Sequence, residues 1–110
     1  MSSVFASNVL AKKDPLESII VTFDFTDALN AGEVLTAIYS VTVTLNSGVD
    51  ATPANILTGT PWITADGLMA QQPVIGGIIG ANYNITMLCD TSTPWRRLSI
   101  TATLPVNDIK

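Results

Sequence analysis

The chain has 110 residues, of which 47% are hydrophobic and only 13% are charged, with a formal net charge of −4 and no histidine. This length indicates one domain. The charge balance excludes the basic surface that nucleic-acid binding needs, and the missing histidine excludes Ser-His-Asp and Cys-His catalysis and ordinary zinc sites.

The N-terminal segment, residues 1–13, places apolar side chains between small polar ones and ends before Asp14-Pro15, a dipeptide that interrupts a strand. It lacks the basic start and continuous apolar run of a signal peptide. We expect it to be an arm that orders on a neighbouring subunit, the alternative being an edge strand of its own domain. Residues 14–110 then form the domain. The apolar residues of the arm are Val4, Phe5, Val9 and Leu10.

The rest of the chain shows a two-residue alternation of apolar and polar side chains, which is typical of half-buried strands. The predicted strands cover residues 18–25, 34–45, 68–75, 83–90 and 97–105, with a short strand or irregular edge in 56–63. Residues 27–33 are expected to be a turn with one helical turn, and Asp66-Gly67 is a hairpin signal. In the strand 18–25 we expect Thr22 and Asp24 to face outward.

Six or seven strands at intervals of about ten residues, without a helical period, predict an all-β fold. We expect an antiparallel β-sandwich of immunoglobulin-like topology. Tyr83 opens its strand directly after a loop, where such sandwiches often use a tyrosine hydroxyl to hold that loop. The shared parity of positions within the strands predicts a core that includes Val21, Phe23, Tyr39, Val41, Val43, Ile85, Met87, Ile100 and Ala102.

The sequence carries no pattern that indicates an enzyme, a cofactor site or a metal site. Cys89 lies in phase with apolar residues of its strand, which predicts a buried thiol. The carboxylates Asp24, Asp27 and Glu33 are too sparse for a calcium loop. The uncharged stretch 67–89 is broken by turn residues, so we expect no membrane insertion.

Two tryptophans fall outside the strand rhythm. Trp62 follows a proline, and Trp95 stands in the last hairpin beside Arg96 and Arg97. Each tryptophan either packs locally over its loop or serves as an exposed anchor, since Trp and Arg are frequent in binding hot spots. We therefore take Trp62, Trp95, Arg96 and Arg97, together with the apolar residues of the arm, as candidate partner-binding residues.

The order of the turn signals resembles a family of small tailed-phage virion proteins described as fiber–tail adaptors. The resemblance covers about residues 12–106. Its matching pieces, in chain order, are Lys13-Asp14-Pro15 with Glu17, Phe23-Asp24-Phe25, Ala28-Leu29, Gly32-Glu33, Val41-Thr42-Val43, Gly48-x-Asp50-x-x-Pro53, Leu57-x-Gly59-x-Pro61, Gly76-Gly77-x-x-Gly80-x-x-Tyr83 and Leu104-Pro105-Val106. The family pattern often has glycine in the last hairpin, where this chain has Pro94-Trp95.

The resemblance implies a non-enzymatic structural protein of the virion tail that attaches tail fibers to the tail or connector ring. Its partners would be other virion proteins, in several copies per particle, and its assembly would take place in the host cytoplasm. Two alternatives remain. One is a capsid decoration or cement subunit. The other is a carbohydrate- or cell-surface-binding module, in which the tryptophans would stack on sugars.

Overall fold

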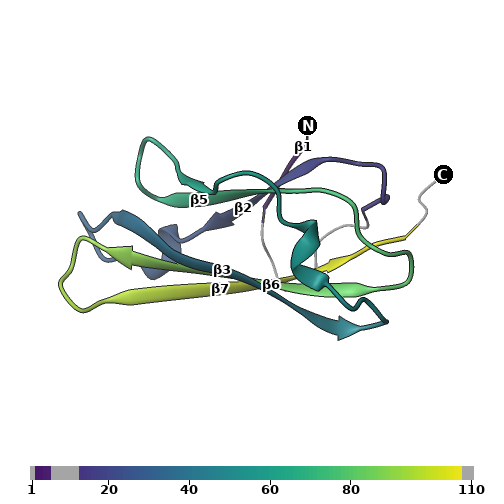
Figure 1. The fold of residues 1–110 in the computed structure, drawn as a ribbon. Helices are drawn as coiled ribbons and strands as arrows, with labels where there is room; N and C mark the ends of the chain where they lie inside the picture. Colours follow the sequence, from purple (N-terminus) through teal and green to yellow (C-terminus); the bar gives the residue numbers. More distant parts are fainter. Residues whose placement is uncertain (1, 6–12, 108–110) are drawn as a thin grey trace.

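The computed structural model describes the backbone of residues 2–5 and all of residues 13–107. The described chain is all-β and forms two layers (Figure 1). One sheet has the order β1-β2-β5-β4, and the other has the order β3-β6-β7. The first sheet comprises β1 (Ser2–Phe5), β2 (Ile19–Asp24), β5 (Met69–Val74) and β4 (Trp62–Ile63), and the second comprises β3 (Leu35–Ser47), β6 (Asn82–Thr91) and β7 (Arg97–Pro105).

The core lies between the two sheets, where each strand points alternate side chains inward. In β6 every second residue from Tyr83 to Thr91 is buried, which confirms the predicted inward face of that strand. Of the predicted core, Val41 and Ile100 are half-buried against the cluster. The buried members of the prediction are Val21, Phe23, Val43, Ile85, Met87 and Ala102.

Tyr39 was predicted to be in the core, and this is wrong: its side chain is 58% exposed. Leu35 faces the core, but β3 has one irregularity between Leu35 and Ala37, before Tyr39, and a second between Ile38 and Ser40, at Tyr39 itself. A bulge shifts the alternation by one residue. As a result Ile38 packs inward and Tyr39 turns to solvent.

Thr22 lies on the outer face of its sheet, as predicted, because it alternates with the core residues Val21 and Phe23, yet its side chain is buried. Its hydroxyl oxygen accepts a hydrogen bond from the amide of Gln71 at 2.9 Å. Gln71 lies directly opposite Thr22 on the neighbouring strand β5. A polar position can therefore be buried within this face because a cross-strand amide satisfies it.

The N-terminal strand β1 pairs with β2 in a parallel register, Ser2 with Ile19 through Phe5 with Thr22. This pairing departs from the antiparallel expectation and gives residues 2–5 the place of an edge strand. Val9 and Leu10 of the predicted arm lie outside the described residues.

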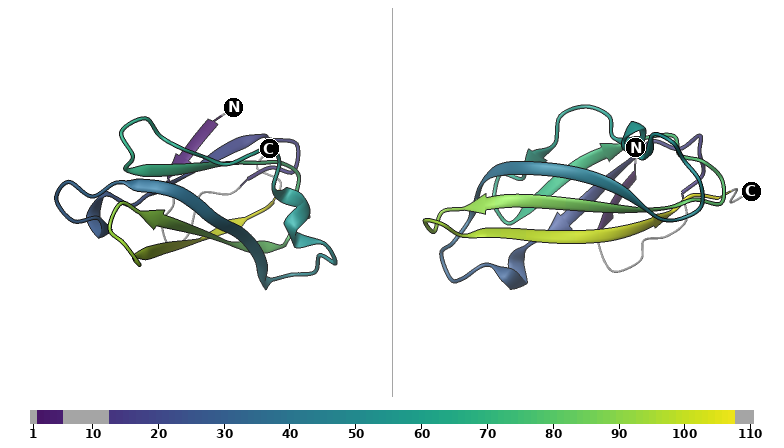
Figure 2. Two further views of the ribbon diagram at one scale, coloured as in Figure 1. Left: turned by 60° about the vertical axis from the view of Figure 1, so that its left-hand side comes forward. Right: turned by 60° about the horizontal axis from the view of Figure 1, so that its bottom comes forward.

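The molecule is elongated, with extents of 43 × 24 × 23 Å, and the strands run along its length (Figure 2). Because β6 has ten residues, its two ends lie roughly 30 Å apart. The connections 25–34, 64–68 and 91–96 meet at one end, here called the Trp95 end. The connections 14–17, 48–52 and 75–80 meet at the other, here called the Ile79 end.

Candidate functional site: a braced hairpin that presents Trp95

The Trp95 end is built around the tight turn between β6 and β7. The amide of Arg96 donates to the carbonyl of Thr93 at 3.2 Å, which closes a four-residue turn over Pro94 and Trp95. Trp95 has a φ of +66°, the one positive φ among the described residues other than glycine. Proline followed by a residue of positive φ is the pattern of a type II turn, where glycine is preferred. Here the position holds a fully exposed tryptophan.

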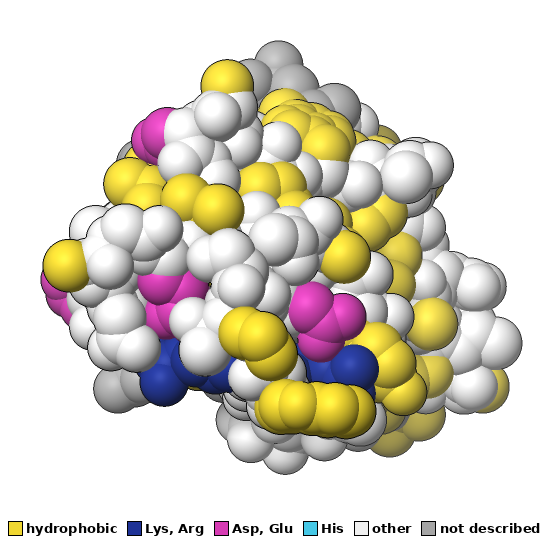
Figure 3. Space-filling view, turned by 90° about the vertical axis from the view of Figure 1, so that its left-hand side faces the viewer, with side chains coloured by type: hydrophobic (Ala, Val, Ile, Leu, Met, Phe, Trp, Pro, Cys, Tyr) yellow, Lys and Arg dark blue, Asp and Glu magenta, His cyan; other side chains and the backbone are white. Residues whose placement is uncertain are grey.

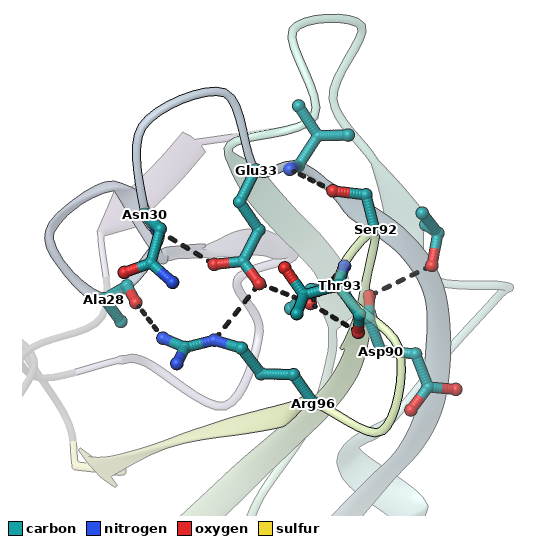
Figure 4. A network of polar contacts seen from close by, with 10 residues as sticks. Ala28, Asn30, Glu33, Asp90, Ser92, Thr93 and Arg96 are labelled. Carbon is teal, nitrogen blue, oxygen red and sulfur yellow. Dashed lines mark hydrogen bonds and ion pairs between the residues drawn. The ribbon is translucent and has the colours of Figure 1, made fainter.

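Glu33, at the end of the 25–34 connection, braces this turn (Figure 4). Its side chain is 2% exposed and lies 3.1 Å from Nε of Arg96, with which it forms an ion pair. The hydroxyl of Thr91 donates to Glu33 at 2.6 Å, and the amide of Asn30 donates to its other oxygen at 2.9 Å. Arg96 also donates to the carbonyl of Ala28 at 2.6 Å. The 25–34 connection is thus joined to the hairpin by a buried charged network.

The network holds Glu33 in its ionised form. The hydrogen bond from the backbone of Asn30, followed by those from Thr91 and Thr93 and by the charge of Arg96, lowers the pKa of Glu33 to about 2 against the opposing effect of burial. Removing either partner of such a pair leaves an uncompensated charge beside the other. The ion pair therefore fixes the hairpin relative to the rest of this end.

A second arginine, Arg97, lies next to the hairpin on the outer face of the β3-β6-β7 sheet. Nε of Arg97 donates to Asp90 at 2.7 Å, and the guanidinium lies 3.5 Å from the centroid of the Tyr39 ring. The hydrogen bond to Asp90 is the main cause that raises the pKa of Arg97. The exposed position of Tyr39 thus has a structural consequence, because it brings an aromatic ring under the hairpin.

The hairpin borders an open hollow of about 390 Å³ lined by residues from Asp90 to Arg97. Figure 3 views this end of the molecule and shows acidic and basic side chains next to one another among hydrophobic ones in its lower part. Since Arg96 pairs with Glu33 and Arg97 with Asp90, the hairpin offers an aromatic ring beside two cations that are paired. Such a surface suits protein recognition, in which aromatic residues and Arg are enriched.

The other candidate residues are not gathered at this turn. Trp62 lies on the short strand β4, where its indole N–H donates to Gln71 at 2.8 Å and its side chain is partly covered. Val4 and Phe5 lie on β1 at the edge of the β1-β2-β5-β4 sheet. The structure thus brings together Trp95, Arg96 and Arg97 and leaves Trp62 and the arm elsewhere.

The Ile79 end is a second rigid set of loops. The Tyr83 hydroxyl accepts a hydrogen bond from the amide of Ile78 at 2.9 Å and donates one to Asp50 at 2.7 Å, which joins two of the three connections. Gly48 has a φ of +89°, and an added Cβ would lie 2.6 Å from Cα of Ala81, so glycine is needed at this close approach. Despite these ties the loops leave large apolar side chains exposed, namely Leu16, Val49, Ile75, Ile78 and Ile79.

Lys13 joins the third connection to this end. Its ammonium is buried and donates to the carbonyls of Asp14 at 2.9 Å and Gly76 at 2.7 Å. Burial lowers the pKa of Lys13, and the negative charges of Glu17 and Asp14 oppose that effect. Sequence reasoning gave Lys13 no structural role, whereas it connects the start of the domain to the loop after β5.

The cysteine and two of the carboxylates that the sequence analysis considered as possible reactive or metal-binding groups have structural roles instead. Cys89 is buried, as predicted, and burial together with the charge of Asp90 raises the pKa of its thiol to about 11. Asp24 accepts hydrogen bonds from the amide and hydroxyl of Thr26, while Glu33 belongs to the network with Arg96. Within the described residues, no three His, Cys, Asp or Glu side chains form a group able to hold a metal ion.

Sequence reasoning missed the supporting residues of the hairpin. Glu33 follows Asn30 by three positions, the spacing at which a side chain returns to cap an earlier amide, and this signal was available. The contacts of Arg96 with the 25–34 connection join residues far apart in the chain, and no local sequence pattern predicts them.

In the part of the chain that the structure describes, no helix has the length and hydropathy to span a membrane.

Residues 13–105 match the family model described as "Podophage GP4 fiber-tail adaptor protein gp77". No curated protein matches the chain. The family match spans both ends of the sandwich, including Glu33, Arg96, Tyr83 and Lys13.

Proposed function

Because the chain belongs to the podophage fiber-tail adaptor family and is a structural component of the phage tail, we propose that it attaches tail fibers to the tail or connector ring by binding a different partner at each end. Its partners on this proposal are other virion proteins, and it acts without catalysis. The assembly of several copies takes place in the host cytoplasm.

The observation that carries the proposal is the pair of unlike ends on one elongated sandwich. At the Trp95 end an exposed indole stands on a turn braced by Glu33 and Arg96. At the Ile79 end, loops tied by Tyr83 and Lys13 leave aliphatic side chains in solvent. Both surfaces are exposed yet internally fixed, so binding would require little ordering of the protein.

We further infer that the sandwich is immunoglobulin-like. The strand order β1-β2-β5-β4 facing β3-β6-β7 corresponds to the two-sheet order of a seven-stranded immunoglobulin domain. The hydroxyl of Tyr83 near the start of β6, bound to a backbone amide five residues earlier, supports the same assignment. The parallel pairing of β1 with β2 is the departure from that pattern.

The arm of residues 1–13 keeps its proposed role in assembly. We propose that it orders on a neighbouring subunit in the particle, with Val4, Phe5, Val9 and Leu10 as its contacts. The parallel β1–β2 pair supports the alternative, in which residues 2–5 complete their own sheet. Deleting residues 2–11 separates the two. A folded chain that fails to assemble supports the intermolecular arm, and a chain without cooperative unfolding contradicts it.

The adaptor function is tested in phage particles that carry Trp95→Gly. This change removes the indole at a position where glycine is favoured, so the fold remains. We expect particles that lack fibers in electron micrographs. If the adaptor remains on those particles, the hairpin contacts the fiber. If the adaptor is missing as well, the hairpin contacts the tail or connector ring. The matched control is Thr42→Ala, at an exposed position on β3 between the two ends, which should leave fibers in place. A full set of fibers on the Trp95→Gly particles would contradict the proposal.

A further inference from the structure

A second hollow, of about 420 Å³ and here called the side hollow, opens where β3 faces β4. Its walls come from the middle of β3 and from residues 57–61, which lead into β4. These residues leave β5 between two pairings, that of Leu57 with Val74 and that of Trp62 with Gln71. The gap between the two pairings gives access from outside to the inner face of β5.

The side hollow lies away from the points at which the described chain is interrupted. Residues 6–12 are flanked by β1, the far edge of one sheet, and by Lys13, whose amide donates to Pro105 at the end of β7, the far edge of the other. Asn107, which precedes residues 108–110, donates to the carbonyl of Lys13 at 2.9 Å. The width of the sheets separates the side hollow from these points.

The floor of the side hollow is a buried glutamine. Gln72 alternates with Ala70 and Val74 on the inner face of β5 and is 1% exposed. Its amide nitrogen donates to the carbonyl of Thr58 at 3.1 Å and to that of Pro73 at 2.7 Å. Because both of these neighbours are acceptors, the amide has one favourable orientation, and its oxygen points away from them.

The amide oxygen of Gln72, Oε1, accepts no hydrogen bond from the described residues. It is also absent from the buried polar atoms that are closed to solvent and lack a partner, so it is open to the hollow that Gln72 lines. Buried polar atoms normally have a hydrogen-bond partner. A ligand that enters the side hollow and displaces water from Oε1 must therefore bring a donor of its own.

The walls beside Oε1 are uncharged and largely aliphatic. Ile38, Val41 and Leu57 line the hollow and also pack against the core cluster. Among the described residues, no charged side chain lines it. The other polar lining residues are more exposed than Gln72 and surround the mouth; they are Tyr39, Ser40 and Thr60.

This lining selects for an apolar ring that carries one donor at its tip. The phenol of a tyrosine has this form: its ring can lie between the aliphatic walls while its O–H reaches the acceptor at the floor. The N–H of an indole projects from the side of the ring instead. A sugar is disfavoured, because several of its hydroxyls would be buried against aliphatic walls without partners.

We propose that the side hollow binds a tyrosine side chain of another virion protein, whose hydroxyl donates to Oε1 of Gln72. Aromatic side chains that fill a pocket carry much of the binding energy of protein interfaces. This contact lies between the two ends and adds to those proposed above. Only the source of the tyrosine rests on the proposed function, since affinity for a phenol is a property of the chain itself.

Titration of the isotopically labelled chain with p-cresol, the tyrosine side chain itself, tests the proposal by nuclear magnetic resonance. Toluene is the paired probe, because it has the same ring without the hydroxyl. We expect millimolar p-cresol to shift the signals of Ile38, Val41 and Gly59 and the side-chain amide of Gln72, and to bind at least about twofold more tightly than toluene. Gln72→Met should reverse this preference, because a hollow without an acceptor disfavours a buried hydroxyl.

Gln71→Met is the matched control. Gln71 is adjacent in sequence but faces the outer side of β5, where its amide donates to Thr22, so this variant should keep the preference for p-cresol. Circular dichroism establishes that both variants fold, and the comparison of the two probes on the wild type does not depend on them.

Absence of p-cresol binding, equal binding of toluene and p-cresol to the wild type, or shifts that fall outside the side hollow would overturn the proposal. Shifts of the lining residues by glucose but not by p-cresol would also overturn it and identify a sugar as the ligand. These outcomes are independent of whether Trp95→Gly particles lose their fibers, so a failure here is distinguishable from a failure of the adaptor function.

Discussion

Trp95 occupies a backbone position that glycine would adopt at lower cost. A left-handed conformation costs an ordinary residue about 1–2 kcal/mol, and the exposed indole recovers none of it by packing. Strained, exposed residues held by a well-determined surrounding are typical of functional sites. A tryptophan at a position that favours glycine is therefore consistent with a side chain that contacts a partner.

The first prediction is that Trp95→Gly leaves the free energy of unfolding unchanged or raises it by up to about 1 kcal/mol, because relief of strain exceeds the added entropy of the unfolded chain. Chemical denaturation measures this. A loss of stability of more than about 1 kcal/mol would show that the indole packs on the domain.

The ionisation of Glu33 makes the stability of the fold depend on pH. Its pKa is about 2 in the folded protein, below its ordinary value of 4.5. Ionised Glu33 therefore stabilises the fold fully above about pH 4.5, and this contribution is lost as the pH falls toward 2. We expect Glu33→Gln to lower the melting temperature at neutral pH and to reduce its pH dependence between 4.5 and 2.

Thermal unfolding followed by circular dichroism at a series of pH values measures this effect. Asp27→Asn is the control, since it removes an exposed carboxylate from the same connection. If Glu33→Gln and the wild type lose stability in parallel on acidification, Glu33 does not carry the linkage.

Cys89 gives a third test at the scale of a single residue. Because burial raises the pKa of its thiol to about 11, the native protein should react with a thiol reagent only as fast as it unfolds. Stopped-flow labelling with and without denaturant measures the two rates. Rapid, complete labelling of the native protein would contradict the buried placement.

At the scale of the strands, most of the fold could be predicted because alternation reports which face is buried. The pattern fails in β3, where the odd-numbered positions look uniformly apolar but the bulges move Tyr39 outward and Ile38 inward. A bulge depends on pairing with β6, and the sequence of one strand does not contain it. The hairpin carrying Trp95 was predicted, whereas its support by Glu33 required the tertiary structure.

The exposed position of Tyr39 can be tested by comparing its substitution with that of a buried aromatic residue, Phe23. Phe23→Ala removes a fully buried ring and should cost about 3–5 kcal/mol of unfolding free energy. Tyr39→Ala should cost no more than about 1 kcal/mol, corresponding to its exposed stacking with Arg97. Urea denaturation compares the two. Equal losses would place Tyr39 in the core and contradict the bulged register.

At the scale of the whole molecule, the two sheets hold two unlike surfaces at opposite ends of an elongated domain. The aromatic turn at the Trp95 end and the aliphatic loops at the Ile79 end are fixed by separate sets of contacts, around Glu33 and around Tyr83 and Lys13. The sequence alone did not reveal the Ile79 end, because its apolar residues come from connections that the chain order separates. This separation of surfaces is what an adaptor requires.

Site-specific photo-cross-linking in intact particles tests the central claim most directly. A photoreactive amino acid is placed at Trp95 in one preparation and at Ile79 in another, and the captured proteins are identified by mass spectrometry. The account predicts two different virion proteins, one from the fiber and one from the tail or connector. Capture of the same protein at both positions, or of capsid shell protein alone, would contradict it.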